Sequence, residues 1–336
     1  MIELSTLNEI DKAGMYKVYD KWPQLAKENS EKIFEPVDFR FINHIVFVGM
    51  GGSGALSDIF QALLSKSNVH VSIVKGYLLP NPIDSNTLVI VTSISGDTDE
   101  SITVLDSAKN RNCNVIAFSS GGKIEEYCKK NKIEYRKILQ IHSPRASFII
   151  FLYGMLKVLA NVIPIKNEDI EDSIIQLNNL SKKINSNNLT SSNPSYELAK
   201  WLSSIPVIYY PLGLQAAAIR FKNSLNENAK RPAIAEDVIE ASHNGIVSWE
   251  NHSNIIPILL TGWDDHKKTK ERWEILKEFF DTKNIEYKQI MSVQGSILGK
   301  LINMIYLLDY SSIYLAVMAR VDPSPVKSID FVKGRL

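Results

Sequence analysis

The stretch HIVFVGMGGSG, from His44 to Gly54, decides the fold of the first half of this 336-residue chain. Its β-branched apolar part predicts a buried strand, and the glycines that follow predict a turn into a helix over residues 53–65. Glycines let the backbone approach a ligand closely, and the start of a helix presents N–H groups and partial positive charge. We therefore expect Gly51, Gly52 and Ser53 to form part of an anion-binding loop.

A second stretch of the same kind, TLVIVTSISGDT, runs from Thr87 to Thr98. Its apolar strand is followed by Ser93, Ser95 and Thr98, which place hydroxyl groups at the start of another predicted helix. Two such loops at the carboxyl ends of parallel strands can hold one phosphate group. The alternative is an ordinary helix cap made by Ser95 or Thr98.

The glycines also match the dinucleotide-binding pattern G-x-G-x-x-G. An NAD site needs an acidic residue at the end of the next strand to hold the ribose. That strand, VHVSIVKG, ends in Lys75 instead. NAD binding therefore remains an alternative that the context disfavours.

Apolar strands alternate with helical segments along most of the chain, which is typical of parallel sheets covered on both faces. The expected strands cover residues 69–74, 87–93, 114–119, 133–138, 205–211, 254–262 and 285–290, and the expected helices cover residues 53–65, 98–111, 145–162, 214–230, 266–282 and 296–318. We predict an α/β protein with two αβα sandwich domains of related topology, each with a mostly parallel sheet. A helical segment is expected over residues 1–35, the domains over 36–163 and 196–320, a helix and linker over 164–195, and a tail over 321–336.

Charge and cysteine content narrow the possible partners. Lys and Arg number 38 and Asp and Glu number 37, so no overall field favours nucleic acid or an anionic membrane. Cys113 and Cys128 form neither a metal-ligand spacing nor a disulfide framework, which is typical of a reduced compartment. The acidic start, MIELSTLNEIDK, is unlike a signal peptide, and the apolar stretch Phe148–Pro164 is short for a bilayer and contains Lys157. We expect a cytoplasmic protein with no nucleic-acid or membrane partner.

The motif GMGGSG, followed about forty residues later by SISGDT, resembles the sugar-isomerase (SIS) domain family. The resemblance implies that these loops bind a phosphorylated sugar. An enzyme that interconverts aldoses and ketoses needs a carboxylate base, a cation beside the enediolate oxygens, and acid–base groups that open the sugar ring.

Three residues have the right chemistry for those roles. Arg145, in HSPRASF, lies at the head of an apolar helix, where its guanidinium could stabilise an enediolate, although a lone Arg more often pairs a carboxylate. Glu227, in NSLNENAK, lies near a helix C-terminus, where a carboxylate opposes the helix dipole. His243, in ASHNGI, lies in a loop-like stretch and carries an imidazole, the side chain most often used for acid–base chemistry. Each of them taken alone is also compatible with a purely structural or solvated role.

Together the motifs PRAS, ENAK and SHN and the C-terminal VDPSPVKSIDFVKGRL resemble the bifunctional phosphoglucose/phosphomannose isomerases of archaea and some bacteria, over Ile45–Leu336. The resemblance implies two SIS domains and a homodimer in which His243 is contributed across the interface. Glu227 would move the proton between C1 and C2, Arg145 would stabilise the enediolate, and His243 and Lys333 would open the ring. No metal or nucleotide cofactor is implied. The residues that would hold the substrate, chiefly its phosphate, are Gly52, Ser53, Ser93, Ser95 and Thr98.

Three positions depart from the family pattern. Asp97 stands where the Asn of SGNT is usual. An acid at this position is unfavourable beside a phosphate dianion unless it points away or caps a helix. Ser324 stands where the Thr of VDPTP is usual, and we expect the loss of a methyl group to adjust the space near C2 of the sugar. Ser147 stands where the last Ala of PRAA is usual, and we expect this difference to have little effect.

Two other functions remain open. A phosphosugar sensor would bind without chemistry, but such regulators usually carry a basic helix-turn-helix, and residues 1–40 contain no basic helical pair. Another SIS enzyme, such as an aminosugar-phosphate isomerase or deaminase, would share the same loops.

Overall fold

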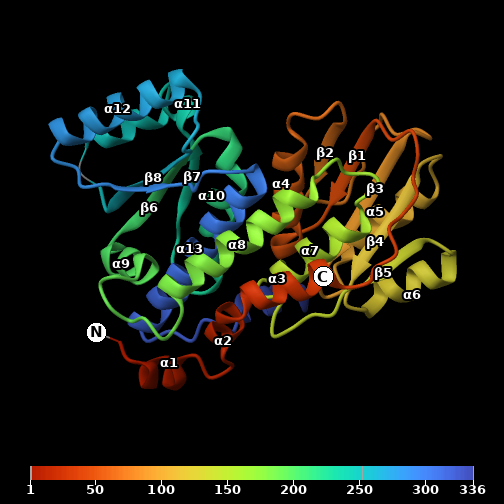
Figure 1. The fold of residues 1–336 in the computed structure, drawn as a ribbon, viewed down its shortest axis with the longest axis horizontal. Coiled ribbons are helices and arrows are strands. Elements are labelled where there is room, and N and C mark those ends of the chain that lie inside the picture. Colours follow the sequence, from red (N-terminus) through yellow and green to blue (C-terminus); the bar gives the residue numbers. More distant parts are fainter. Residues whose placement is uncertain (1, 252, 336) are drawn as a thin grey trace. The chain divides into compact units, whose positions relative to one another are not determined.

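The computed structural model describes residues 2–251 and 253–335, which form two compact units (Figure 1). The N-terminal unit contains residues 21–174, and the C-terminal unit combines residues 1–20 with residues 175–336. Helix α8, Asn167–Ile184, spans the boundary. The first twenty residues thus group with the second half of the chain, which differs from the division expected from the sequence.

The N-terminal unit is built on a fully parallel sheet of five strands in the order β2-β1-β3-β4-β5. The central strand β3 and its neighbour β1 are buried along their whole length, because helices cover both faces. The strands are β1 His44–Val48, β2 His70–Val74, β3 Thr87–Ser93, β4 Asn114–Ser119 and β5 Glu134–Lys137, and the helices are α3 Trp22–Glu31, α4 Gly51–Leu64, α5 Asp99–Lys109, α6 Gly122–Asn131 and α7 Phe148–Val158.

The strand order reverses at β1, because the chain runs from β1 to β2 on one side and then to β3 on the other. β1 and β3 are neighbours in register, with Val48 paired to Val91. The glycine loop after β1 and the serine loop after β3 therefore leave the same edge of the sheet next to each other. In open α/β sheets, this reversal is where ligands bind.

The C-terminal unit has a parallel sheet of four strands in the order β7-β6-β8-β9. This is the strand order of the first four strands of the other sheet, so the prediction of two α/β domains of related topology is confirmed. The strands are β6 Ile205–Tyr210, β7 Ile234–Asp237, β8 Ile255–Thr261 and β9 Lys288–Met291. Strand β7 was not expected from the sequence, because it is a short edge strand that ends in two acidic residues.

Helix α13, Ile297–Met318, is the central helix of the C-terminal unit. It is long and apolar enough to cross a membrane, but 89% of its apolar window is buried inside the structure, as in the core helix of a folded domain. The Tyr306 hydroxyl donates to the Tyr19 carbonyl at 2.7 Å, which ties the N-terminal segment to this helix. The other helices of the unit are α1 Leu4–Ile10, α2 Met15–Asp20, α9 Pro194–Trp201, η1 Leu212–Leu214, α10 Gln215–Glu227, α11 Val238–Ala241, η2 Gly245–Glu250, α12 Lys267–Thr282 and α14 Lys327–Lys333.

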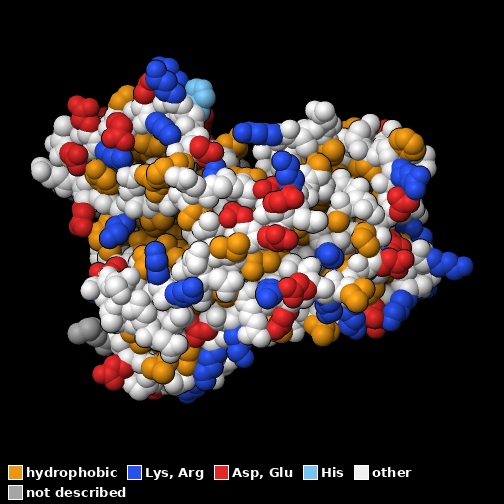
Figure 2. Space-filling model, viewed as in Figure 1, with side chains coloured by type: hydrophobic (Ala, Val, Ile, Leu, Met, Phe, Trp, Pro, Cys, Tyr) orange, Lys and Arg blue, Asp and Glu red, His pale blue; other side chains and the backbone are white. Residues whose placement is uncertain are grey.

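Two expected elements differ in their bounds. The helix expected over residues 145–162 is α7, which begins only at Phe148, because residues 143–147 form a turn. The C-terminal tail contains a helix of its own, α14, whose residues are all exposed. On the face shown in Figure 2, basic and acidic side chains are mixed, in agreement with the near-zero net charge.

Candidate active site

The first candidate loop ends where α4 begins, at Gly51. Its N-cap residue, Met50, makes no side-chain capping bond. Gly51 has a φ of +51°, and a Cβ built there would meet no atom within 4 Å, so the start of the helix opens outward. The exposed helix N-terminus is therefore available to an anion.

The second loop is ordered by its own hydroxyl groups. Ser93 Oγ accepts the Gly96 N–H at 3.1 Å and lies 2.8 Å from Thr98 Oγ1. Thr98 occupies the N-cap position of α5, but its side chain makes no capping bond. Gly96 has a φ of +85°, and a Cβ there would lie 1.9 Å from the Gly121 carbonyl oxygen, so only glycine fits. The hydroxyl groups thus shape the loop and do not cap the helix through Thr98.

One hydrogen bond joins the two loops. Ser53 Oγ, on the first turn of α4, accepts the Ile94 backbone N–H of the second loop at 3.1 Å. Ser53 and Ile94 are both buried. Because Ser53 uses a lone pair for this bond, its own hydroxyl proton stays available to an acceptor such as a phosphate oxygen.

Asp97 points away from the serine loop toward another helix. Its Oδ1 accepts the Lys123 N–H at 3.0 Å, in the first turn of α6. A carboxylate at that place also complements the helix dipole. Asp97, the residue that departs from the family pattern, therefore caps the start of α6.

Lys75, which follows β2 where an NAD site would have an acid, is paired with Asp58 of α4 at 2.6 Å. Burial raises the pKa of Asp58 above its usual value, and Lys75 opposes that shift. A cation bonded in this way offers no acceptor for a ribose hydroxyl, which argues against the dinucleotide alternative.

Arg145 lies beside the first loop. A Cβ built on Gly52 would be 3.6 Å from the backbone N and Cα of Arg145, so the two backbones are in contact. The Arg145 residue is 6% exposed. Its turn is held by Ser147, whose hydroxyl donates toward the carbonyls of Ile141 at 2.6 Å and Ser143 at 2.9 Å and accepts the Ile141 N–H at 2.9 Å. Ser147, expected to matter little, therefore shapes the backbone that carries Arg145.

Glu227 is the last residue of α10 and lines a cavity of about 720 Å³. Lys230 and Lys327 also line this cavity, so its walls carry both signs of charge. Lys230 donates to the Glu227 carbonyl oxygen and, at 3.4 Å, to that of Pro323. The end of α10 is thereby linked to the C-terminal segment.

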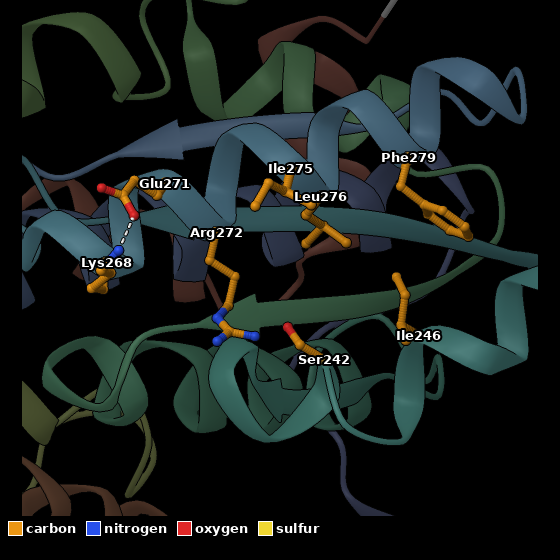
Figure 3. A pocket seen from close by; sticks show the side chains of 8 residues that line it. All are labelled: Ser242, Ile246, Lys268, Glu271, Arg272, Ile275, Leu276 and Phe279. Carbon is orange, nitrogen blue, oxygen red and sulfur yellow. Dashed lines mark hydrogen bonds and ion pairs between the residues drawn. The ribbon is translucent and has the colours of Figure 1, made fainter.

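His243 is exposed, just after α11. Its neighbour Ser242 lines a second pocket of about 390 Å³, between α12 and the segment around α11 and η2. In Figure 3, Arg272 of α12 points toward Ser242, and the Lys268–Glu271 ion pair, at 2.8 Å, lies on the same helix. This pocket does not include Glu227.

The remaining candidates lie in the C-terminal segment. Lys333 is exposed in the last turn of α14. Ser324 Oγ is 3.4 Å from Asp11 Oδ1, and its N–H donates to Asp322 Oδ1 at 2.9 Å. The segment after α13 thus folds back onto the N-terminal residues of the same unit.

The structure brings together the phosphate-loop candidates and Arg145 within the N-terminal unit, whereas Glu227, His243 and Lys333 belong to the C-terminal unit. Sequence reasoning assigned no role to Lys230 and expected little effect from Ser147. Lys230 is the last residue of the ENAK motif, but nothing in the sequence says that its side chain returns to the Glu227 carbonyl oxygen. Among residues 2–251 and 253–335, no group of three or more His, Cys, Asp or Glu side chains is arranged to hold a metal ion.

The chain has two parallel sheets of matching strand order. In the first sheet, a glycine loop and a serine loop lie side by side where the strand order reverses, and this arrangement places the protein in the sugar-isomerase class. Residues 39–136 match the SIS domain family, and residues 191–336 match the bacterial phospho-glucose isomerase C-terminal SIS domain. A hypothetical protein of Thermus thermophilus has the same fold, with a TM-score of 0.73 and 12% identity, covering 98% of this chain and 91% of its own.

Curated relatives identify the family within that class. The chain is 32% identical to the bifunctional phosphoglucose/phosphomannose isomerase of Caldicellulosiruptor bescii, covering 93% of this chain and 95% of that protein. It is 27% identical to the protein of the same name from Aquifex aeolicus, with 96% of each covered. A D-glucosamine-6-phosphate 4-epimerase of Sulfolobus acidocaldarius is 26% identical, covering 73% of this chain and 77% of that protein. The chain belongs to the bifunctional phosphoglucose/phosphomannose isomerase family.

Proposed function

We propose that this protein interconverts glucose 6-phosphate and mannose 6-phosphate with fructose 6-phosphate. The observation that carries the proposal is the loop pair of the N-terminal unit, joined by the Ser53–Ile94 hydrogen bond and backed by Arg145, in a chain of this family. A bound substrate needs an anion site, a cation and a base, and the chain supplies a candidate for each.

The phosphate group binds to the two loops. The uncapped start of α4 supplies backbone N–H groups, and the hydroxyls of Ser53, Ser95 and Thr98 supply further donors. Because Asp97 is bonded to the first turn of α6, its carboxylate does not compete for these donors. No metal or nucleotide takes part in this binding scheme.

Glu227 acts as the base. Its carboxylate takes the C2 proton of the open-chain aldose, and the electron pair moves through C1 to the carbonyl oxygen, which leaves an enediolate. The Arg145 guanidinium stabilises the negative charge on that oxygen. The proton is then returned to C1, and the hydroxyl proton of O2 passes to O1 as the C2=O2 double bond of the ketose forms, so atoms and charge balance.

His243 and Lys333 open the ring. The ring oxygen must gain a proton while the O1 hydroxyl loses one, and a pair of groups of which one donates and the other accepts a proton can do both. The exposed positions of His243 and of Lys333 on α14 leave both side chains accessible to a substrate.

One base can serve both aldoses, because the enediolate has lost the stereochemistry at C2. Glucose 6-phosphate and mannose 6-phosphate differ only at that carbon and therefore give the same intermediate. Ser324, near the segment that lines the Glu227 cavity, is the candidate for adjusting the space at C2.

The functional unit is a homodimer in which His243 completes the partner's site. Exposed apolar side chains lie on neighbouring elements: Val247 of η2 is 58% exposed, and Ile275, which lines the same pocket as Ser242, is 65% exposed, as expected of a surface that a second copy covers. The protein works in the cytoplasm, and the free thiols Cys113 and Cys128 are compatible with that compartment.

The test of the reaction is a coupled assay that follows fructose 6-phosphate from each aldose phosphate. The wild-type protein should convert both, and Glu227→Gln, which keeps the size of the side chain but removes the base, should lose at least about a hundredfold in kcat. Turnover at the buffer rate by folded wild-type protein would refute the proposal, and full activity of Glu227→Gln would remove the base.

The dimer arrangement is tested by mixing two inactive variants, Glu227→Gln and His243→Ala. If His243 acts across the interface, a mixed dimer contains one intact site, and equal mixing restores about a quarter of the wild-type activity. If both residues act within one chain, mixing restores nothing.

The epimerase relative makes an aminosugar phosphate a second candidate substrate. Glucosamine 6-phosphate is therefore included in the assay, with detection of ammonia and of the C4 epimer. Conversion of this substrate faster than of glucose 6-phosphate would favour the second candidate. Tight binding of glucose 6-phosphate without hydrogen exchange at C2 would instead indicate a sensor.

A further inference from the structure

A buried polar seam lies between α10 and α13, the two helices that pack together in the C-terminal unit (Figure 1). Arg220 Nε and Nη2 donate to Asp309 Oδ2 at 2.9 Å and 2.6 Å, and both side chains are almost completely buried, at 3% and 0% exposure. Ser224 donates to Asp309 Oδ1 at 2.7 Å, and Tyr19 of α2 donates to Oδ2 at 3.1 Å. Four hydrogen bonds thus converge on one carboxylate.

The seam continues to the end of α10. Asn228, the C-cap residue, donates from its amide to Ser312 Oγ at 2.8 Å, and Ser312 donates to the Asp309 carbonyl at 2.6 Å. Arg220, Ser224 and Asn228 follow one another at intervals of four residues, so they share one face of α10. That face is therefore locked to α13 over its last two turns.

Glu227 stands at the end of this locked helix, between Ser224 and Asn228 in the chain. It is seven residues after Arg220, which places both on nearly the same side of the helix. A carboxylate at a helix C-terminus opposes the helix dipole and needs compensation. Burial by itself would lower the pKa of Arg220, but Asp309 and other neighbouring groups raise it above its ordinary value. The charge of Glu227 contributes to that rise.

We propose that the buried Arg220–Asp309 pair, with Ser224 and Asn228, is a positioning device that holds Glu227 in place for proton transfer. A buried ion pair is weak evidence for stability, because its desolvation offsets most of its attraction, and an apolar pair of similar volume is often as stable. Its use here is geometric, since a displacement of about 1 Å at a reacting group costs about a hundredfold in rate. The inference rests on Glu227 being the base proposed above.

The main test replaces the pair by apolar side chains of similar volume, as Arg220→Met with Asp309→Leu. We expect a folded protein whose KM for glucose 6-phosphate is within about twofold of wild type and whose kcat is lower by about tenfold or more. The deuterium isotope effect on kcat, measured with substrate deuterated at C2, should rise, because proton transfer becomes slower relative to the other steps. A smaller folded fraction alone would lower kcat and leave the isotope effect unchanged.

A matched control removes buried hydrogen bonds elsewhere on α13. The Tyr314 hydroxyl donates to the Ile184 carbonyl at 2.8 Å and accepts from the Asn193 amide at 3.3 Å, and Tyr314→Phe removes both bonds without changing a residue of the seam. The control should lower the melting temperature and leave kcat and the isotope effect at the wild-type values. If it changes them as the double variant does, the effect is general to α13 and the proposal is wrong.

Ser224→Ala decides the matter if the double variant does not fold, because it removes one bond to Asp309 and leaves both charges paired. It should lower kcat about threefold with KM unchanged. If the double variant folds and has the wild-type kcat and isotope effect, the proposal is wrong. If the double variant does not fold, the same result for Ser224→Ala overturns it. Activity in Glu227→Gln would instead show that the assigned base is wrong, so the two failures are distinguishable.

Discussion

The bond between the two loops gives the sharpest prediction for the proposed phosphate site. Ser53→Ala removes the acceptor of the Ile94 N–H, which then stays buried without its partner. An unsatisfied buried group costs about 1–3 kcal/mol. At about 3 °C per kcal/mol for a domain of this size, the middle of that range lowers the melting temperature by about 6 °C.

The same change removes a donor to the substrate. A hydrogen bond to a charged group contributes about 1.5–3 kcal/mol, so the KM for glucose 6-phosphate should rise by about tenfold to a hundredfold. The two effects are measured separately, by calorimetry without ligand and by the coupled assay below the melting temperature.

Ser101→Ala is the matched control. Ser101 Oγ is buried and has no hydrogen-bond partner among the described residues, so its removal should leave the melting temperature unchanged or raise it. KM should stay at the wild-type value. Equal melting temperatures and KM values for Ser53→Ala and Ser101→Ala would refute the role assigned to the loop bond.

Three further predictions concern other parts of the N-terminal unit. Burial, together with the neighbouring His70, lowers the pKa of His44 in the folded protein from its ordinary value of 6.5. As the pH falls through that value, the unfolded chain binds more protons than the folded chain, so stability decreases. The melting temperature should therefore drop more between pH 7.5 and 5.5 in wild type than in His44→Gln. Asp97→Asn keeps an acceptor for the Lys123 N–H and should change stability by less than about 0.5 kcal/mol, whereas Asp97→Ala should cost about 1 kcal/mol in urea unfolding; equal curves would contradict the cap. Burial raises the pKa of Cys128 to about 11, so a thiol reagent at pH 7.5 should modify it only after unfolding, while the half-buried Cys113 reacts sooner.

Local patterns were enough to predict most of the first sheet. The β-branched runs around Val46 and Val89 are continuous because their strands are buried on both faces, and this signal does not depend on distant residues. Strand β7 escaped prediction because an edge strand needs little apolar surface. Helix α7 was predicted too long, because the apolar composition continues through a turn that the Ser147 hydroxyl forms with backbone groups.

The candidate site residues could be named from motifs, but their working geometry could not. That Asp97 belongs to α6 depends on where the loop after β3 meets the loop after β4, which is a contact between segments 26 residues apart. That Ser53 holds the second loop is likewise a long-range contact.

By itself the sequence determined the α/β class, the two halves of related topology, and the chemical groups available for phosphosugar isomerisation, because periodicity, glycine turns and residue types are local properties. Only the tertiary structure decided that α1 and α2 pack on α13 and that Arg220, Ser224 and Asp309 meet between α10 and α13. Hydrogen bonds between distant segments form when the chain folds, and no local pattern specifies the partner.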